Sequence, residues 1–230
     1  MEALTRVRME QNYYLEGGYK LYHMARLHPG EREHLEALIQ WFFPVAGAFY
    51  ADFGCGIGTI MDHLEKVYDA HTVGINISPE QASCCLARGL CIKQGTYTQS
   101  GLPDNSVDAV LFMETFGYCD PAETLHECAR VLKPGGEIWL KDFFFMGNTY
   151  QRKEVYKVWR YVFYQQQELE ALFQSYGFSL QWEEFEGHIE HYLEMMMRMH
   201  LNGLQTFVPC AGAGDLRDGF KYILGKATRV

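Results

Sequence analysis

The sequence predicts an α/β protein built on a doubly wound, mostly parallel sheet, and three observations support this expectation. Between about residues 47 and 145, five short apolar segments alternate with stretches of helical pattern. A glycine-rich turn follows the first apolar segment directly. Helix start and stop signals then separate the remaining segments. Strands that alternate with helices in this way favour a parallel sheet covered by helices on both faces.

The five apolar segments are the expected strands, and in order they read GAFYADF, HTVGINI, LCIKQG, VDAVLFME and EIWLKDFFF. Helices are expected over residues 60–68, 79–89 and 121–132. Ser78 and Asp120 stand where an N-cap should stand, each directly before a proline at the first helical position. The last of these helices should stop at VLKPGG, because Pro134 and two glycines cannot continue it.

The whole chain of 230 residues is expected to form one domain. Residues 1–45 would be an N-terminal helical cover, 46–147 the core, and 148–230 the remaining strands and further helices. Helical patterns at 12–42 and 150–205 are rich in aromatic residues and are candidates to cover a substrate site. Packing as plain outer helices is the simpler alternative. Lys226 and Arg229 are expected in an ordinary polar tail.

Composition and charge exclude several classes of protein. The formal net charge is -9, which gives no broad electrostatic surface for nucleic acid. Seven cysteines without paired CxxC spacing fit reduced thiols better than a disulfide framework or a zinc site. The N-terminus lacks an apolar signal region, and no apolar run approaches the length of a membrane span. We therefore expect a cytoplasmic protein with a small-molecule partner; the oligomeric state is left open, a homo-oligomer included.

The most specific motif is ADFGCGIGT at residues 51–59, between a strand and a helix. A dinucleotide-binding loop would place its third glycine at position 59, which is Thr59 here. The motif instead resembles the D-x-G-x-G-x-G of class I S-adenosylmethionine-dependent methyltransferases. That resemblance implies a Rossmann-like fold, S-adenosylmethionine as methyl donor, and helical covers over the acceptor site at both ends of the chain.

Residues that bind the donor follow from the same resemblance. The loop backbone would hold the amino acid end of the donor, and Asp52 offers a carboxylate there. VGINISPEQ at 73–81 resembles V-G-x-D-x-S-x-x-Q, with Asn76 in place of the acid that binds the ribose, and QGTY at 94–97 resembles G-D-[AF], with Thr96 in place of the acid that binds adenine. The expected donor contacts are Asp52, Gly54, Cys55, Gly56, Gly58, Asn76, Ile77, Gln81, Thr96, Tyr97 and Met113.

Glu114 ends the fourth expected strand, at the edge of the sheet where ligands bind in such folds. Glu114 followed by Tyr118 resembles the E-x-x-x-Y of prenyl diphosphate C-methyltransferases, and the segment resembles the sterol and cyclopropane fatty acid groups as well. The resemblance implies methyl transfer to an alkene carbon, with Glu114 and Tyr118 as catalytic residues, Glu114 as the base, and aromatic faces around a carbocation. Alternatively, Glu114 is a structural acid whose hydrogen bonds are satisfied within the protein, or it contacts the methyl donor.

Aromatic and basic residues outside the core are the candidates for binding the acceptor. The N-terminal segment of residues 13–23 loosely resembles the aromatic Y-x-x-G-x-G segment of sterol methyltransferases. The aromatic candidates are Tyr13, Tyr14, Tyr19, Tyr22, Phe116, Tyr118, Trp159 and Tyr161. Arg152, Lys153, Lys157 and Arg160 form a cationic patch at helical spacing that could hold a diphosphate, and only then would Mg²⁺ be needed. A solvated helix face that pairs with Glu154 is the alternative.

Three functions compete. The first is C-methylation of an isoprenoid, for example a short prenyl diphosphate, in secondary metabolism. The second is O- or N-methylation of a small natural product, with Glu114, His23, His188 or His191 deprotonating the acceptor. The third is a regulatory module that binds the donor without catalysis, which the aromatic flanks disfavour. His188 and His191 lack a third metal ligand at a recognised spacing, so no metal site is expected there.

Overall fold

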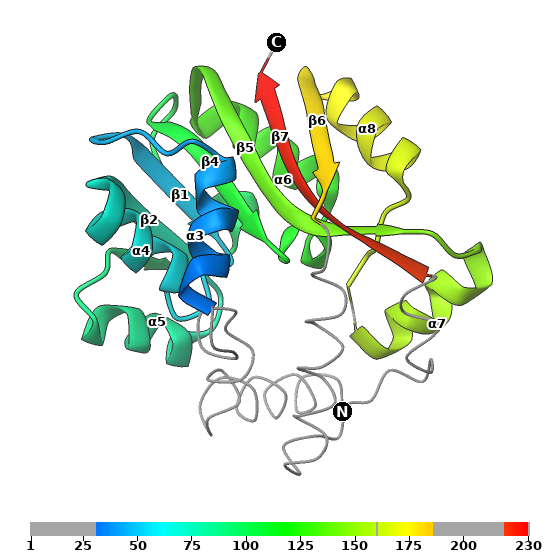
Figure 1. Cartoon of the computed structure of the whole chain (residues 1–230), viewed down its shortest axis with the longest axis horizontal. Helices are drawn as coiled ribbons and strands as arrows, with labels where there is room; N and C mark the ends of the chain where they lie inside the picture. The colour runs from blue at the N-terminus through cyan, green and yellow to red at the C-terminus, as the bar shows by residue number, and fades with distance from the viewer. Residues whose placement is uncertain (1–30, 160, 186–218, 230) are drawn as a thin grey trace.

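A computed structural model describes residues 31–159, 161–185 and 219–229 of the chain (Figure 1). One seven-stranded sheet runs through this part in the order β3-β2-β1-β4-β5-β7-β6. The strands are β1 (Phe49–Phe53), β2 (His71–Asn76), β3 (Ile92–Gln94), β4 (Val107–Met113), β5 (Leu132–Phe145), β6 (Phe178–Glu184) and β7 (Phe220–Arg229). The helices are α3 (Glu31–Trp41), α4 (Thr59–Tyr68), α5 (Pro79–Ala87), α6 (Pro121–Val131), α7 (Thr149–Trp159) and α8 (Gln166–Ser175), with short 3₁₀ helices η3 (Tyr97–Gln99) and η4 (Phe116–Tyr118).

The predicted doubly wound sheet is confirmed. β1 pairs in parallel with β2 and β4, β2 with β3, and β4 with β5, so the five expected strands form the parallel part. β7 is inserted antiparallel between β5 and β6. The expectation of a polar tail at Lys226 and Arg229 was wrong, because both residues belong to β7 and pair with neighbouring strands. Their apolar strand neighbours, among them Tyr222 and Leu224, are buried, because β7 lies between two other strands of the sheet.

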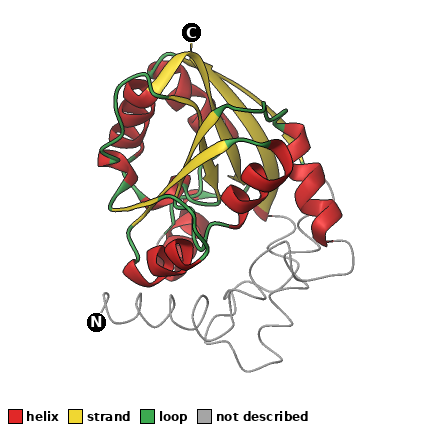
Figure 2. Cartoon of the chain, turned by 90° about the vertical axis from the view of Figure 1, so that its left-hand side faces the viewer, coloured by secondary structure: helices red, strands yellow, loops and turns green. Residues whose placement is uncertain are grey.

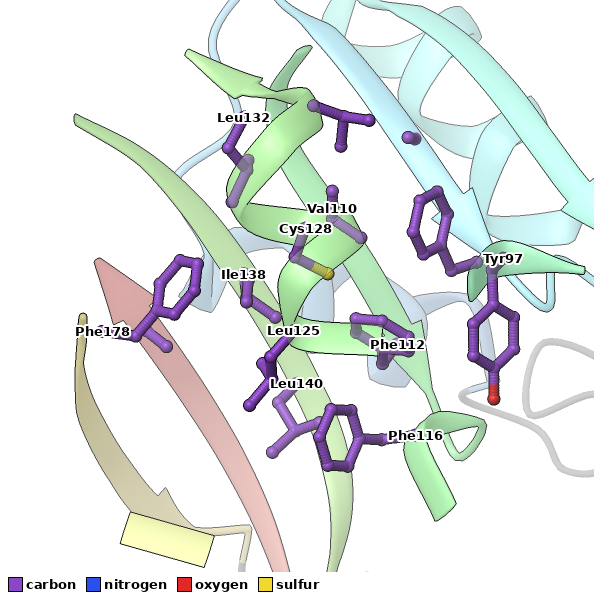
Figure 3. Close-up of a cluster of buried hydrophobic side chains, with 14 of the residues drawn as sticks. Tyr97, Val110, Phe112, Phe116, Leu125, Cys128, Leu132, Ile138, Leu140 and Phe178 are labelled. Atoms are coloured by element: carbon purple, nitrogen blue, oxygen red, sulfur yellow. The ribbon is translucent and has the colours of Figure 1, made fainter. Parts of the chain in front are cut away.

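Alternate residues of the strands supply two separate hydrophobic layers, as expected for a sheet buried on both faces. Tyr50, Leu111 and Trp139 point to the layer under α3 and α4. Ala51, Phe112 and Leu140 point to the other layer, where α6 and α8 cover the sheet. Figure 2 shows the sheet edge-on with helices on both sides, and Figure 3 shows the second layer from within.

The helices begin and end where short-range chemistry dictates. Ser78 caps α5, since its hydroxyl accepts the backbone N–H of Gln81 at 3.3 Å. Asp120 caps α6 by accepting the backbone N–H groups of Ala122 and Glu123 at 2.9 and 3.0 Å. Both caps are as predicted. α6 ends at Val131, before Pro134 and the two glycines. Residues 150–205 were expected to hold two helices; α7 and α8 are present, but residues 178–184 form β6.

The carboxyl ends of the parallel strands meet along one edge of the sheet, which faces downward in Figure 1. The turns after β1, β2 and β4 and the end of β5 therefore lie side by side along this edge. Within the residues that the structure describes, none of the helices has the length and apolar content needed to span a bilayer.

Candidate active site

The glycine turn between β1 and α4 has a backbone that only glycine adopts readily. Gly54, Gly56 and Gly58 have φ values of 86°, 56° and 78°. A Cβ atom on Gly54 would lie 2.6 Å from the Thr115 Cγ2 atom, which is far inside van der Waals contact. The Thr115 hydroxyl also donates to the Phe53 carbonyl at 2.6 Å. The end of β4 is thus packed directly against the glycine turn, and any side chain at position 54 would separate them.

Asp52 lies at the carboxyl end of β1, just before the glycine turn, and its side chain is buried. Burial in a poorly hydrated site raises the pKa of Asp52 to about 7, because the ionised carboxylate loses its water. A bound cation would favour the ionised form again. The position therefore suits a ligand that carries a positive charge.

Asn76 connects the end of β2 to the glycine turn. Its amide nitrogen donates to the Gly56 carbonyl at 3.1 Å and to the Gln81 side chain at 2.6 Å. Its oxygen accepts the backbone N–H of Ser78 at 3.0 Å. Asn76 and Gln81 are buried, whereas the neighbouring Ile77 is 57% exposed. The donor contacts predicted for these three residues stay predictions, but the network explains how an amide in place of a carboxylate stabilises the turn itself.

Two thiols lie beneath the same turn. Cys55 and Cys85 both approach the Gly56 carbonyl, at 3.8 and 3.5 Å from their Sγ atoms. The contact with Cys85 and burial raise the pKa of Cys55 well above its usual range. Cys55 is therefore a neutral thiol at neutral pH and packs as a small apolar group.

Thr96 and Tyr97 lie in the turn after β3. Thr96 caps η3, since its hydroxyl accepts the backbone N–H of Thr98 at 3.3 Å. The Tyr97 ring stacks on Phe53 with centroids 5.7 Å apart and donates through its hydroxyl to the Thr115 carbonyl at 2.6 Å. In Figure 3 this hydroxyl points away from the apolar cluster. Tyr97 thus links the β3 turn to the end of β4, and its predicted contact with adenine is not tested by this geometry.

Glu114 follows β4 in a left-handed conformation, with φ at 62°, which is uncommon for a residue with a side chain. Its backbone N–H donates to the Lys141 carbonyl at 2.7 Å. The Lys141 ammonium donates to the Glu114 Oε1 atom at 2.6 Å, and the Tyr222 hydroxyl donates to the same oxygen. Burial lowers the pKa of Lys141, while the Glu114 carboxylate opposes this effect. The expected acid at this edge is therefore the anion of a nearly buried ion pair.

Asp142, the next residue of β5, is a second buried carboxyl at this edge. Its Oδ1 atom accepts the backbone N–H of Phe143 at 2.8 Å, and its Oδ2 atom accepts the Tyr161 hydroxyl. Burial raises the pKa of Asp142 to about 7 against the effect of these hydrogen bonds. The Tyr161 ring in turn meets the edge of the Tyr118 ring, with centroids 4.7 Å apart.

A pocket of about 620 Å³ opens next to Tyr161, between α7, α8 and the start of α6. Its wall includes two residues predicted to bind the acceptor, Arg152 and Lys153. The Arg152 guanidinium is paired with Glu168 of α8, a different acid from the Glu154 expected as its alternative partner. Most of the remaining wall is aromatic or aliphatic, and it consists of Pro121, Thr149, Tyr156, Tyr161, Val162, Tyr164 and Leu172.

The structure brings together only part of the predicted acceptor site. Tyr118 is 49% exposed, near the pocket that Tyr161 lines. Phe116 is buried in the core, where its ring meets Phe112 at 5.3 Å (Figure 3), and this packing does not favour its role as an acceptor contact. Met113 is partly buried against the first hydrophobic layer. Other predicted residues lie outside the described residues or have side chains outside the description: Tyr13, Tyr14, Tyr19, Tyr22, His23, Lys157, Trp159, Arg160, His188 and His191.

Lys141, Asp142 and Tyr222 are site residues that the sequence did not reveal. The signal was present for the first two, because a lysine and an aspartate interrupt an otherwise apolar strand in EIWLKDFFF. Tyr222 carries no such signal, since its approach to Glu114 depends on the insertion of β7 beside β5. In the described part of the chain, no three His, Cys, Asp or Glu side chains gather as metal ligands.

Residues 51–140 match the family model described as a methyltransferase domain. This part of the chain is therefore similar to a methyltransferase domain. An uncharacterized methyltransferase of Mycobacterium tuberculosis is 36% identical over 106 residues, which cover 44% of this chain and 42% of that protein. A sterol 24-C-methyltransferase of Neurospora crassa is 28% identical over 164 residues, which cover 64% of this chain and 43% of that protein. The chain spans about two fifths of the length of these curated relatives.

The fold of the chain also resembles that of solved structures. Geranyl diphosphate C-methyltransferase from Streptomyces coelicolor A3(2), solved with Mg²⁺, geranyl diphosphate and S-adenosyl-L-homocysteine, superposes with a TM-score of 0.76. The identity is 20%, over 92% of this chain and 84% of that chain. This likeness confirms the class I fold that the glycine motif implied.

Proposed function

We propose that this chain transfers a methyl group from S-adenosylmethionine to a small, largely apolar acceptor. The observation that carries the proposal is the direct packing of Thr115, next to Glu114, against Gly54 of the glycine turn. A donor held by the turn would then have its reactive sulfonium close to the residues that follow β4. Since the sulfonium is already an activated methyl donor, bringing donor and acceptor into contact supplies much of the rate.

The donor would lie across the ends of β1, β2 and β4. Asp52 would pair with its ammonium group, which explains why a buried carboxyl with a raised pKa stands at this point. The glycine turn would hold the amino acid end, and the turns after β2 and β3 would hold the ribose and the adenine. The proposed contacts are Asp52, Gly54, Cys55, Gly56, Gly58, Asn76, Ile77, Gln81, Thr96, Tyr97 and Met113.

An alkene carbon of an isoprenoid is the acceptor that we propose. The names of two similar proteins, a sterol 24-C-methyltransferase and a geranyl diphosphate C-methyltransferase, support this class. The aromatic wall of the pocket beside Tyr118 and Tyr161 supports it as well, because such rings stabilise a carbocation. Glu114 would lie near the attacked carbon. Lys141 and Tyr222 donate hydrogen bonds to one oxygen of Glu114. The Glu114 carboxylate would therefore stabilise the positive charge of the carbocation. The sequence analysis expected Glu114 to act as the base.

O- or N-methylation of a small molecule is the second candidate, and one observation favours an acceptor without a diphosphate. The Arg152 guanidinium is already paired with Glu168, so this cation of the patch is not available for a diphosphate without breaking the pair. Arg152→Gln and Lys153→Gln test whether the acceptor carries a diphosphate. If a diphosphate binds there, both variants raise its KM by about tenfold, as for a lost charged hydrogen bond, while the KM of an uncharged acceptor stays unchanged.

Labelled donor tests the proposal directly. The chain is incubated with labelled S-adenosylmethionine and a panel of prenyl diphosphates, hydroxyl compounds and amines, with and without Mg²⁺. We expect label on carbon in a prenyl compound. Transfer only to oxygen or nitrogen would establish the second candidate, and no transfer to any acceptor would refute methyl transfer to these classes.

Glu114→Gln then tests the acceptor side. We expect turnover to fall by at least about 100-fold, because a charge that stabilises the transition state is lost, while the affinity for S-adenosylhomocysteine changes little. Glu123→Gln is the matched control, since Glu123 is an exposed acid on α6. An equal loss of affinity for S-adenosylhomocysteine would assign Glu114 to the donor site instead.

A further inference from the structure

Two carboxyls, Glu114 and Asp142, lie at the edge of the sheet where the acceptor would bind, which we call the acceptor edge. Their surroundings differ. Glu114 accepts hydrogen bonds from a cation, Lys141, and from the Tyr222 hydroxyl, both on one oxygen. Asp142 accepts from two neutral donors, the Phe143 backbone and the Tyr161 hydroxyl. A carboxylate paired with an ammonium group is a poor proton acceptor, whereas a buried carboxylate bound by neutral donors is a better one. The surroundings of Asp142 are therefore suited to accepting a proton.

Tyr161 joins Asp142 to the pocket and to the donor turn. The residue forms part of the wall of the pocket between α7 and α8. It also packs against Gly117, where an added Cβ would lie 2.6 Å from the Tyr161 Cε1 atom. The neighbouring Val162 N–H donates to the Gly117 carbonyl at 2.9 Å. Because the same short loop begins at Thr115, one continuous set of contacts runs from Gly54 through this loop to Tyr161.

We propose that Tyr161 and Asp142 form the proton-accepting pair for the acceptor bound in this pocket, with Tyr161 as the catalytic residue and Asp142 as its positioning residue. This inference rests on the proposed methyl transfer, and it assigns the proton to a different carboxyl from Glu114. It holds for a carbon acceptor and for a hydroxyl or amine acceptor alike, because each must lose one proton after or during methylation.

The proton step balances without any further reagent. As the methyl group bonds to the acceptor and leaves the sulfonium, the acceptor becomes positively charged. Its proton moves to the Tyr161 oxygen while the Tyr161 proton moves to the Asp142 Oδ2 atom, and the electrons of the broken bond remain on the acceptor. The product is neutral at that atom, Tyr161 is unchanged, and Asp142 holds a proton that later passes to solvent.

The ionisation of the pair fits this role. Burial holds the pKa of Tyr161 well above its usual range, so its hydroxyl stays neutral. Tyr161 would therefore accept a proton from the acceptor only as it gives its own proton to Asp142. Burial raises the pKa of Asp142 to about 7, and the Tyr161 hydrogen bond lowers it. The charged or titratable groups that influence Asp142 from its own strand and its neighbours are Lys141, Glu114, Tyr161, Tyr97 and Tyr164. The rate should therefore rise with pH and level off above about pH 7.

Single-turnover methyl transfer at saturating donor, measured between about pH 5 and pH 9, tests the pair. Geranyl diphosphate is the first probe, followed by whichever acceptor of the panel takes the label. Tyr161→Phe should lower the rate by about tenfold or more and move the remaining inflection to higher pH, because the hydrogen bond that lowers the Asp142 pKa is lost. Asp142→Asn should remove the inflection. The affinity for S-adenosylhomocysteine should be unchanged in both variants.

Tyr176→Phe and Asp104→Asn are matched controls, since these residues lie outside the pocket wall and outside the acceptor edge. A wild-type profile retained in Tyr161→Phe and in Asp142→Asn would overturn the inference while leaving methyl transfer intact. Absence of transfer by the wild type to the whole panel would overturn both. If Tyr161→Phe does not fold, Asp142→Asn decides alone, because asparagine keeps the shape of the side chain and the bond from Phe143.

Discussion

The proposed donor edge and the proposed acceptor edge of this sheet are built on different principles. The centre of the donor edge is the glycine turn, a continuous segment of residues 52–58 that is defined by its backbone conformation. The acceptor edge gathers buried polar side chains from four places far apart in the chain: Glu114 after β4, Lys141 and Asp142 in β5, Tyr161 before α8, and Tyr222 in β7. A local motif therefore identifies the first edge, whereas only the folded sheet assembles the second.

Removal of one charge should damage the acceptor edge most. Lys141→Met leaves the Glu114 carboxylate without its cation in a site where its side chain is 14% exposed. We expect a loss of about 3 kcal/mol in the free energy of unfolding, since breaking one side of a buried pair leaves an uncompensated charge. Urea denaturation near neutral pH measures this loss.

The double variant Lys141→Met with Glu114→Gln is the control for that loss. It removes both charges, so most of the stability should return although the residual methyl transfer stays low. If the double variant is as unstable as Lys141→Met, the loss comes from the contact of the Lys141 ammonium with the Tyr222 ring, whose centroid lies 4.9 Å away, and the acceptor edge does not depend on the pairing of Lys141 with Glu114.

A side chain added to the donor edge should have the next largest effect. Gly54→Ala combines a strained φ of 86° with an overlap against Thr115. Left-handed backbone costs about 1–2 kcal/mol for a residue with a Cβ, and the overlap adds to this value. We expect a total loss near 2–3 kcal/mol and an affinity for S-adenosylhomocysteine weakened by about tenfold or more, measured by calorimetry.

Gly89→Ala isolates the strain from the overlap. Gly89 has a φ of 78°, but an added Cβ would meet nothing within 4 Å. This variant should lose about 1–2 kcal/mol and keep its affinity for S-adenosylhomocysteine. Equal affinities in the two alanine variants would show that close packing of the turn on Thr115 does not matter for the donor.

The same contrast explains what could be predicted from the sequence. Five strands, two caps and the glycine turn depend on neighbours within a few residues, so periodicity and turn chemistry predict them. Pairing of β7 between β5 and β6 depends on residues more than 70 positions from β5, at Glu137 and Thr228 for example, and nothing local in FKYILGKATR indicates it. The position of Glu114 at this edge of the sheet was predicted from its place at the strand end, but its partners Lys141 and Tyr222 could be identified only from the folded sheet.

Substitution of Asp52 should have a smaller effect on the free energy of unfolding than Lys141→Met or Gly54→Ala, and of opposite sign. The buried Asp52 carboxylate destabilises the folded chain near neutral pH. Burial raises its pKa to about 7 in the folded chain, so the folded state binds the proton more tightly than the unfolded state. The stability from this group is complete below about pH 4 and is lost as the pH rises to about 7. Asp52→Asn should therefore be more stable than the wild type by about 1–3 kcal/mol near pH 8 and equally stable near pH 4.

Asp108→Asn provides a control of opposite sign. Burial acts to raise the pKa of Asp108, but hydrogen bonds from the Lys133 ammonium and the Phe49 backbone hold it below its usual value. The wild type should therefore be more stable than Asp108→Asn at neutral pH and should lose this advantage in acid. The Asp52→Asn variant should also bind S-adenosylhomocysteine about tenfold more weakly than the wild type, because the ammonium group of S-adenosylhomocysteine loses a charged partner. Higher stability together with weaker binding would identify Asp52 as a carboxyl kept for its ligand, whereas unchanged binding would leave the buried charge without a function at this edge.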